Sequence, residues 1–291
     1  MQLYALDDQE RVVFVERAQR QRDYICVECR RAVRVRGGSH RKTHFYHLDT
    51  THHCYLSGKG MEHLQAQLYI KAQFPQDDCQ LELRFPAINR IADVAWLPGK
   101  VVFEIQCAPI SAKEVEARNL DYRSVGWEIV WIFHDSRYNQ WKISAAELAL
   151  RQQAVYFTNI DADGRGMVYD QFDLFYQGKR IGVLGPLPID VKGIASPTSN
   201  VDFASFPKVV GARLQERPHF FSGDLVSLTI GVGGEKHEEY LQKVQQWELW
   251  HEDQTKTKPV QNVDRLRRAM QSYLIRPYKL LFQLLLERAC R

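Results

Sequence analysis

The hydrophobic and polar positions form their clearest pattern between Met61 and about residue 150. From Met61, apolar residues recur at helical spacing, which predicts a helix that ends before Pro75. Apolar and polar residues then alternate, and this period of two predicts strands. The three predicted strands cover residues 81–85, 88–96 and 101–107. Leu97-Pro98-Gly99-Lys100 separates the last two, and its turn chemistry predicts an antiparallel meander.

A second helix and a fourth strand follow. Ser111 and Glu114 have the spacing of a capping box, so we expect a helix to begin there and to end near Gly126. Residues 127–133 are apolar apart from Glu128, which is typical of a buried strand. This order of elements predicts a mixed α/β core, in which helices flank a mixed sheet.

The N-terminal part of the chain differs from this core. Val33 and Val35 alternate into the turn signal Gly37-Gly38, which predicts a small hairpin-rich module. The segment 56–60 is polar and rich in glycine, and we place a boundary there. The predicted domains are 1–57, a Cys/His module, 58–152, the α/β core, and 153–291, a C-terminal region that is first mixed and then helical.

The C-terminal region has a weaker pattern. We predict strands at 169–176 and 180–184, and a Pro/Gly/Ser-rich loop at 185–200. From residue 235 onward the pattern becomes helical, with Trp247 and Trp250 close together. The last stretch, 263–291, mixes basic residues with leucines and predicts a packed pair of amphipathic helices.

The composition is that of a soluble protein with several parts. The chain has 291 residues, of which 45% are hydrophobic and 25% charged, enough for one sizeable core with smaller modules. Its first residues lack the apolar run of a targeting signal, and no apolar stretch is long enough to cross a bilayer. We therefore expect a protein of the bacterial-type cytoplasm without a membrane partner. In that reducing compartment, the six cysteines favour metal binding over a disulfide framework.

Positive charge is concentrated near the N-terminus, although the net charge is only +4. Between Arg11 and Lys42 the chain has ten Lys and Arg residues against three Asp and Glu residues. Such an excess favours binding to phosphate backbones through counterion release. An arginine-rich surface that merely faces solvent has the same pattern, and both interpretations stay open.

Candidate chemistry lies on the second and third predicted strands. Because side chains alternate between faces, Glu104 and Gln106 should point the same way, and the Pro98-Gly99 turn should bring Asp93 beside Glu104. Two carboxylates among apolar residues are costly to bury unless they bind a cation. Magnesium prefers one or two carboxylates together with water and substrate phosphate. The pattern predicts a magnesium site, whereas the alternative is a surface hairpin with scattered carboxylates.

These residues resemble known motifs. Asp93 is followed after ten residues by Glu104-Ile105-Gln106. This arrangement resembles the PD-(D/E)xK nuclease signature, with Gln106 at the position where a lysine is usual. Over about residues 1–150 the chain resembles the CoiA family of competence proteins. The motifs that carry this resemblance are Cys26-Val-Glu-Cys29, His44-Phe-Tyr-His47, Met61-Glu62-His63, Arg90-Ile-Ala-Asp-Val-Ala95, Phe103-Glu-Ile-Gln-Cys107, Ser111 with Arg118 and Tyr122, and Trp131-Ile-Phe133. The resemblance implies a core like that of restriction endonucleases.

The resemblance also implies roles for single residues. Asp93 and Glu104 would hold Mg²⁺ or Mn²⁺, and Gln106 would orient water or polarise the phosphate. Glu62, on the first helix, would assist through a water molecule or a second ion.

The missing lysine leaves the reaction without an obvious cation. An amide such as that of Gln106 supplies neither positive charge nor a proton, so the metal or another cation has to stabilise the transition state. Arg118 and Tyr122 are four residues apart on one helix, hence on one face, and could supply that charge and a phosphate-orienting hydroxyl. Lys113 is a weaker candidate, and a solvated Arg118 is the structural alternative.

A second candidate site is a zinc-ribbon-like group of cysteines and histidines. Cys26, Cys29, His44 and His47 offer two thiolates and two imidazoles, which suit tetrahedral Zn²⁺. The two histidines are closer together than in the usual zinc finger, so another residue could replace one ligand. The alternative ligands are Cys54, His52 and His53. Without a metal, Cys29 would be a small core residue and the histidines a polar cluster.

Two functions are compatible with these features. The first is a metal-dependent deoxyribonuclease that processes DNA, single-stranded or branched, in natural transformation. The second is a non-catalytic DNA-binding accessory factor that assists a RecA-type recombinase on incoming single strands. Two intact carboxylates favour the enzyme, whereas the absent lysine favours the accessory factor. Sheet edges and the leucine-rich tail could support a homodimer.

Overall fold

The structure is a computed structural model that describes residues 2–38, 41–49, 54, 59–150, 155–176, 178–195, 206–216, 220–230 and 237–256. It has two compact units, Met1–His237 and Glu238–Arg291. No helix among the described ranges is both long enough and apolar enough to cross a bilayer.

The N-terminal module is a small antiparallel sheet with strand order β2-β1-β3-β4-β5. Its strands are β1 (Tyr4–Leu6), β2 (Val12–Phe14), β3 (Asp23–Ile25), β4 (Ala32–Gly38) and β5 (Arg41–His47), with a short 3₁₀ helix η1 (Val15–Arg17). The predicted hairpin is confirmed, since β4 pairs with β5 and Val35 lies opposite Phe45. Val33, Val35, Phe45 and Tyr24 are buried in a core where the rings of Tyr24 and Phe45 meet edge to face. Met61 and Leu64 of the following helix belong to the same core.

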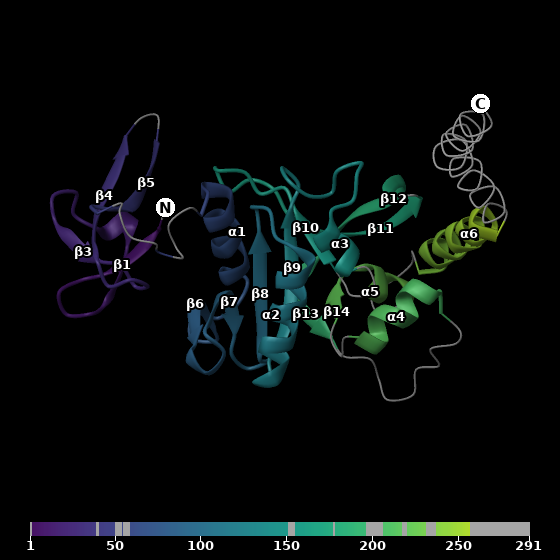
Figure 1. Cartoon of the computed structure of the whole chain (residues 1–291), viewed down its shortest axis with the longest axis horizontal. Helices are drawn as coiled ribbons and strands as arrows, with labels where there is room; N and C mark the ends of the chain where they lie inside the picture. Colours follow the sequence, from purple (N-terminus) through teal and green to yellow (C-terminus); the bar gives the residue numbers. More distant parts are fainter. Residues whose placement is uncertain are drawn as a thin grey trace, which may run out of the picture. The chain divides into compact units, whose positions relative to one another are not determined.

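The second sheet has seven strands in the order β12-β11-β10-β9-β8-β7-β6 (Figure 1). They are β6 (Cys79–Phe85), β7 (Arg90–Trp96), β8 (Val101–Gln106), β9 (Glu128–His134), β10 (Val155–Thr158), β11 (Val168–Tyr176) and β12 (Lys179–Pro188). β8, β9 and β10 are parallel to one another, and the other neighbours are antiparallel. The mixed α/β class with a meander at one end is therefore confirmed. A 3₁₀ turn, η2 (Pro86–Ile88), replaces the start predicted for the second strand.

Helices cover both faces of this sheet. α1 (Met61–Lys71) places Ala66 and Ile70 in a core with Phe103 and Ile105 of β8. α2 (Ala112–Ser124) and the short α3 (Ala145–Ala149) pack into the core of the opposite face, which contains Val102 of the same strand. α2 begins as predicted, because the Ser111 side chain accepts a hydrogen bond from the backbone N–H of Glu114. Strand alternation thus gives β8 two apolar faces.

Two expectations about the later part of the chain were wrong. The boundary predicted at residues 152–153 falls inside the seven-stranded sheet, which β10, β11 and β12 complete. The loop predicted at 185–200 is largely strand in its described part, because β12 continues to Pro188 and β13 (Asp190–Ala195) follows. Proline is tolerated in β12 because this is an edge strand, with no further neighbour that needs its missing N–H. Residues 196–200 lie outside the described ranges.

A small C-terminal layer completes the first unit. β13 pairs with β14 (Phe220–Ser222), and the helices α4 (Lys208–Glu216) and α5 (Leu225–Ile230) accompany them. Asp170 of β11 is fully buried there, and Arg213 of α4 donates to it over 2.6 Å. The backbone N–H of Leu225 donates to the same carboxylate. This buried ion pair joins the layer to the sheet.

The second unit contains α6 (His237–Lys256) from Glu238 onward, and this helix confirms the helical pattern predicted after residue 235. Trp250 of this helix is exposed. The stretch 263–291, for which we predicted a helix pair, lies outside the described ranges.

Removal of the buried arginine tests the importance of this ion pair for the fold. Arg213→Met should lower the free energy of unfolding by about 3–5 kcal/mol, because it leaves the Asp170 carboxylate buried and unpaired. Urea unfolding of the full chain measures this. As the matched control, Arg34→Met removes an exposed ion pair with Asp23 and should change the transition little. Equal effects of the two variants would contradict the prediction.

Candidate active site and cysteine cluster

Asp93 is the most constrained carboxylate of the large sheet. It lies on β7 with 6% of its surface exposed. Its Oδ2 accepts a hydrogen bond from the backbone N–H of Ile105 over 2.8 Å, and its Oδ1 accepts from Lys59 Nζ over 2.6 Å. Burial opposes ionisation, but the neighbouring His63 and Lys59 bring the pKa of Asp93 well below its usual value. Asp93 is therefore a charged group inside the protein.

Glu104 is the neighbouring carboxylate on β8. β7 pairs with β8 up to Val94 opposite Phe103, and the backbone N–H of Ile105 donates to Asp93, which holds Asp93 against the strand that carries Glu104. Tyr122 of α2 donates its hydroxyl to Glu104 Oε1 over 2.7 Å, and Arg118 forms an ion pair with Oε2. Burial and the charge of Asp93 raise the pKa of Glu104 to about 7, although Arg118 and Tyr122 oppose this. The two carboxylates are thus electrostatic neighbours.

A third carboxylate, Glu82 of β6, lies on the other side of Asp93. Lys59 Nζ is 2.6 Å from Glu82 Oε1 and 2.6 Å from Asp93 Oδ1, so its ammonium bridges the two. Gln67 of α1 donates to the same Glu82 oxygen over 2.6 Å. Burial raises the pKa of Glu82, while Lys59 lowers it. Three buried carboxylates therefore share two cations, Lys59 and Arg118.

The structure brings four of the predicted catalytic residues together and leaves Gln106 apart. Asp93 and Glu104 lie on the neighbouring strands β7 and β8, and Arg118 and Tyr122 both reach Glu104 from one face of α2. The side-chain amide of Gln106 instead donates to the backbone carbonyl of Ala108. It turns back on its own chain and, within the part of the chain that the structure describes, makes no hydrogen bond with either carboxylate.

Glu62, the sixth predicted residue, lies near the site without a hydrogen bond to Asp93 among the described residues. Burial raises the pKa of the Cys107 thiol to about 12, and the charges of Asp93 and Glu62 add to this effect. Glu62 and Asp93 therefore act on the same region at the end of β8.

The sequence pattern did not identify three residues of this site, which are Lys59, Glu82 and His63. Lys59 stands in the glycine-rich segment that we interpreted as a boundary, and Glu82 falls between two apolar strand positions. Pairing of Leu81 with Val94 and of Leu83 with Ala92 places Glu82 opposite Asp93. Only this register would have indicated the contact, and the sequence alone does not determine it.

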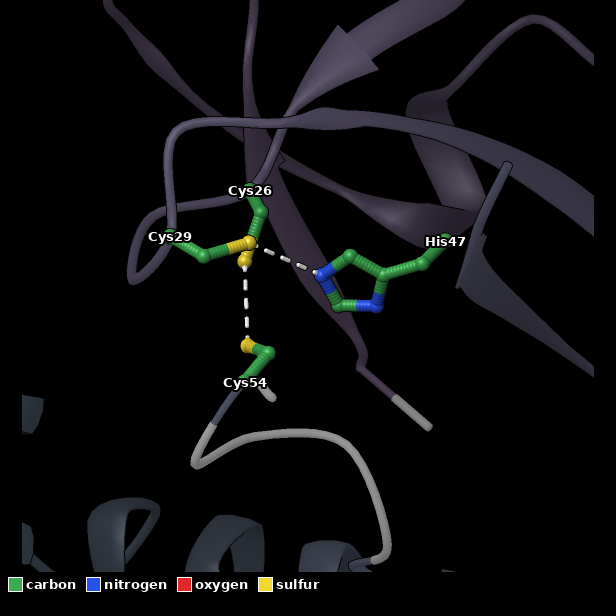
Figure 2. A group of neighbouring side chains, drawn as sticks. All are labelled: Cys26, Cys29, His47 and Cys54. Atoms are coloured by element: carbon green, nitrogen blue, oxygen red, sulfur yellow. Dashed lines mark hydrogen bonds between the residues drawn. The ribbon is translucent and has the colours of Figure 1, made fainter. Parts of the chain in front are cut away.

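The N-terminal module gathers three cysteines and a histidine in one group (Figure 2). The ligand atoms of Cys26, Cys29, His47 and Cys54 all lie within 4.8 Å of one another. Cys29 Sγ is 3.2 Å from His47 Nε2, and Cys26 Sγ is 3.8 Å from Cys54 Sγ. Three thiols and an imidazole form a donor set that suits tetrahedral coordination of a metal ion.

The turn after β3 positions the first two cysteines. The backbone N–H of Arg30 donates to the carbonyl of Cys26, and Arg30 has a positive φ of 59°. The backbone N–H of Glu28 points to Cys26 Sγ at 3.4 Å. This tight turn brings the two sulfur atoms together, and Figure 2 shows Cys29 Sγ directed toward His47 and Cys26 Sγ directed toward Cys54. Burial lowers the pKa of His47, which favours the neutral imidazole that a metal requires.

His44 is not a member of this group, contrary to our expectation, and Cys54 takes its place. His44 and His47 are three residues apart on β5, so their side chains point to opposite faces. His47 pairs with Val33 on the core face, whereas His44 pairs with Arg36. Arg36 Nε donates to His44 Nε2 over 3.0 Å. The alternative ligands His52 and His53 lie outside the described ranges.

Comparison with known proteins identifies both regions. The family model described as "Competence protein CoiA, N-terminal domain" matches residues 6–57, and the one described as "Competence protein CoiA, nuclease-like domain" matches residues 59–169. No curated protein and no solved structure matches the chain. The two matched regions together span more than half of the sequence, and they contain the cysteine cluster and the three buried carboxylates. The chain belongs to the CoiA competence protein family, with an N-terminal domain and a nuclease-like domain.

Proposed function

We propose that the protein is a metal-dependent deoxyribonuclease that hydrolyses phosphodiester bonds in DNA during natural transformation. The observation that supports this most is the burial of Asp93 and Glu104 on neighbouring strands, with Arg118 and Tyr122 held against Glu104. Structural proteins seldom bury adjacent carboxylates, because each charge must be compensated.

The donor set fits Mg²⁺ or Mn²⁺. Asp93 is ionised, and a cation bound beside Glu104 would favour the charged form of that carboxyl as well. Oxygen ligands from Asp93 and Glu104 match the preference of these ions. When bound, the ion would activate water and neutralise charge on the phosphate.

The protein's own side chains would position the DNA. Arg118, with 26% of its side chain exposed, can offer its remaining N–H groups to a phosphate while it stays paired with Glu104. The Tyr122 hydroxyl is engaged by Glu104, and we assign it to orienting this carboxylate. Glu62 remains a candidate to assist through water. Gln106 contacts Ala108, so the lysine missing from position 106 has no substitute at that position.

An accessory role in DNA binding is the second candidate. It is supported by the absent lysine and by the basic stretch between Arg11 and Lys42. Five arginines of this stretch already form ion pairs with acidic residues: Arg11, Arg22, Arg30, Arg31 and Arg34. Exposed pairs of this kind are weak, so a phosphate backbone can compete for them. In this role the protein would present single-stranded DNA to a RecA-type recombinase in the cytoplasm.

Loss of either carboxylate should abolish cleavage. Asp93→Asn and Glu104→Gln each remove a charge that the metal needs, and we expect a fall in magnesium-stimulated cleavage of at least about 100-fold. The assay incubates the purified chain with single-stranded, duplex and branched DNA, with and without Mg²⁺ or Mn²⁺.

Glu116→Gln is the matched control, because Glu116 lies exposed on α2 and should retain full activity. If both active-site variants cleave like the wild type, the nuclease assignment fails. If the wild type binds DNA and cleaves none of the three substrates, the accessory role replaces it.

For the cysteine cluster we propose a structural Zn²⁺ held by Cys26, Cys29, His47 and Cys54. Thiolates favour Zn²⁺ over Mg²⁺, and a small module gains stability from a metal. The ion would connect the turn after β3, strand β5 and Cys54.

The two histidines of β5 provide a matched test of this site. His47→Gln should lower the zinc content from about one ion per chain and destabilise the module, since it removes a ligand. His44→Gln changes the same type of residue on the opposite face and should keep the zinc. Elemental analysis of both purified variants measures the difference. Equal zinc content in the two variants would contradict the ligand assignment.

A further inference from the structure

We propose that His63, Glu82 and Asp93 form a divalent metal site, in which the ammonium of Lys59 occupies the position of the ion while no metal is bound. The proposal rests on the proposed function in one respect, because it shares Asp93 with the predicted magnesium site. It adds two ligands that the nuclease signature does not contain, Glu82 and His63.

The first argument is geometric. His63 on α1, Glu82 on β6 and Asp93 on β7 each offer one ligand atom, and these three atoms lie within 4.8 Å of one another. All three side chains are at least nine-tenths buried, with 9%, 5% and 9% exposed. A helix and two paired strands hold them, so their positions are fixed before any ion arrives.

The second argument is that a cation already lies between the carboxylates. Lys59 Nζ is 2.6 Å from one oxygen of Glu82 and 2.6 Å from one oxygen of Asp93. Two buried carboxylates in a low-dielectric setting require such compensation. A divalent ion would supply twice the charge from the same place.

The third argument is that the ammonium leaves buried groups unsatisfied. Glu82 Oε2 and His63 Nε2 are buried and have no hydrogen-bond partner. The imidazole nitrogen is 3.2 Å from Asp93 Oδ1, an ion-pair distance, so it already points at the carboxylate that would share the ion. Buried polar atoms in native proteins are nearly always partnered. A metal ion would accept a lone pair from each of them.

Neighbouring groups are arranged as around a metal site. Gln67 donates to Glu82 Oε1 over 2.6 Å and to the backbone carbonyl of Asp93 over 3.1 Å, which orients both ligands. Lys59 precedes α1 in a segment without regular structure, so its side chain can leave without unwinding the helix. Binding of the ion and binding of the Lys59 ammonium are therefore mutually exclusive.

The donor set indicates which ions would bind. Imidazole nitrogen favours first-row transition ions, whereas Mg²⁺ favours oxygen ligands alone. One imidazole with two carboxylates therefore suits Mn²⁺ better than Mg²⁺. Mn²⁺ also prefers oxygen-rich sites to thiolates, so the cysteine cluster should not compete for it.

Titration of the full chain with Mn²⁺, followed by electron paramagnetic resonance, tests the proposal. Glu82→Gln and His63→Gln should each raise the Kd at least about tenfold, because each removes a ligand. Lys59→Met should lower the Kd, since it removes the competing cation. Glu116→Gln is the control and should bind as the wild type does. Circular dichroism checks that every variant is folded. If Glu82→Gln does not fold, the Kd of His63→Gln tests the proposal.

Two results would overturn the proposal. One is a Kd within twofold of the wild type in both Glu82→Gln and His63→Gln. The other is loss of Mn²⁺ binding in Glu104→Gln while Glu82→Gln retains it, which would place the ion between Asp93 and Glu104. Neither result touches the nuclease assignment, which depends on cleavage. Conversely, a wild type that binds Mn²⁺ as described but cuts no DNA would refute the nuclease and leave this site intact.

Discussion

The cost of burying charge in the middle of the large sheet governs the site. Asp93 is ionised and nearly inaccessible, and Glu82 and Glu104 flank it on the neighbouring strands. Water cannot compensate these charges, so cations must enter the protein interior. Lys59 reaches Asp93 and Glu82 from the segment before α1, and Arg118 reaches Glu104 from α2. The order of strands and the placement of both helices therefore serve one electrostatic requirement.

Strand alternation predicted much of this arrangement because it acts within one element. The period of two separated Phe103 and Ile105, which face α1, from Glu104, which faces α2. The four-residue spacing of Arg118 and Tyr122 likewise predicted that both reach one place. Contacts between different elements could not be predicted from the sequence. Glu82 meets Asp93 through a strand register that side-chain patterns do not specify.

The cysteine cluster shows the same difference between local geometry, which the sequence predicts, and contacts between distant segments, which it does not. A Cys-x-x-Cys spacing predicts a turn whose sulfur atoms converge, and the structure has this turn. The choice of histidine could also have been made from the sequence, because two strand residues separated by three positions cannot face one ion. Cys54 is different, since it follows β5 in a segment whose path no periodicity determines. The wrong boundary at 152–153 has a related cause, as pairing of β10 with β9 joins residues that are distant in sequence.

The absence of a lysine at position 106 becomes less significant once the cations are located in space. A lysine there would lie on β8, beside Glu104, and would add a third positive charge to a region that already contains Lys59 and Arg118. A further positive charge there would repel a metal ion at Asp93 and Glu104. Gln106 is neutral and adds no such repulsion. In this interpretation, Gln106 leaves the buried carboxylates able to attract a metal ion. Lys59, from the segment before α1, and Arg118, from α2, supply the positive charge that a lysine at position 106 would have supplied.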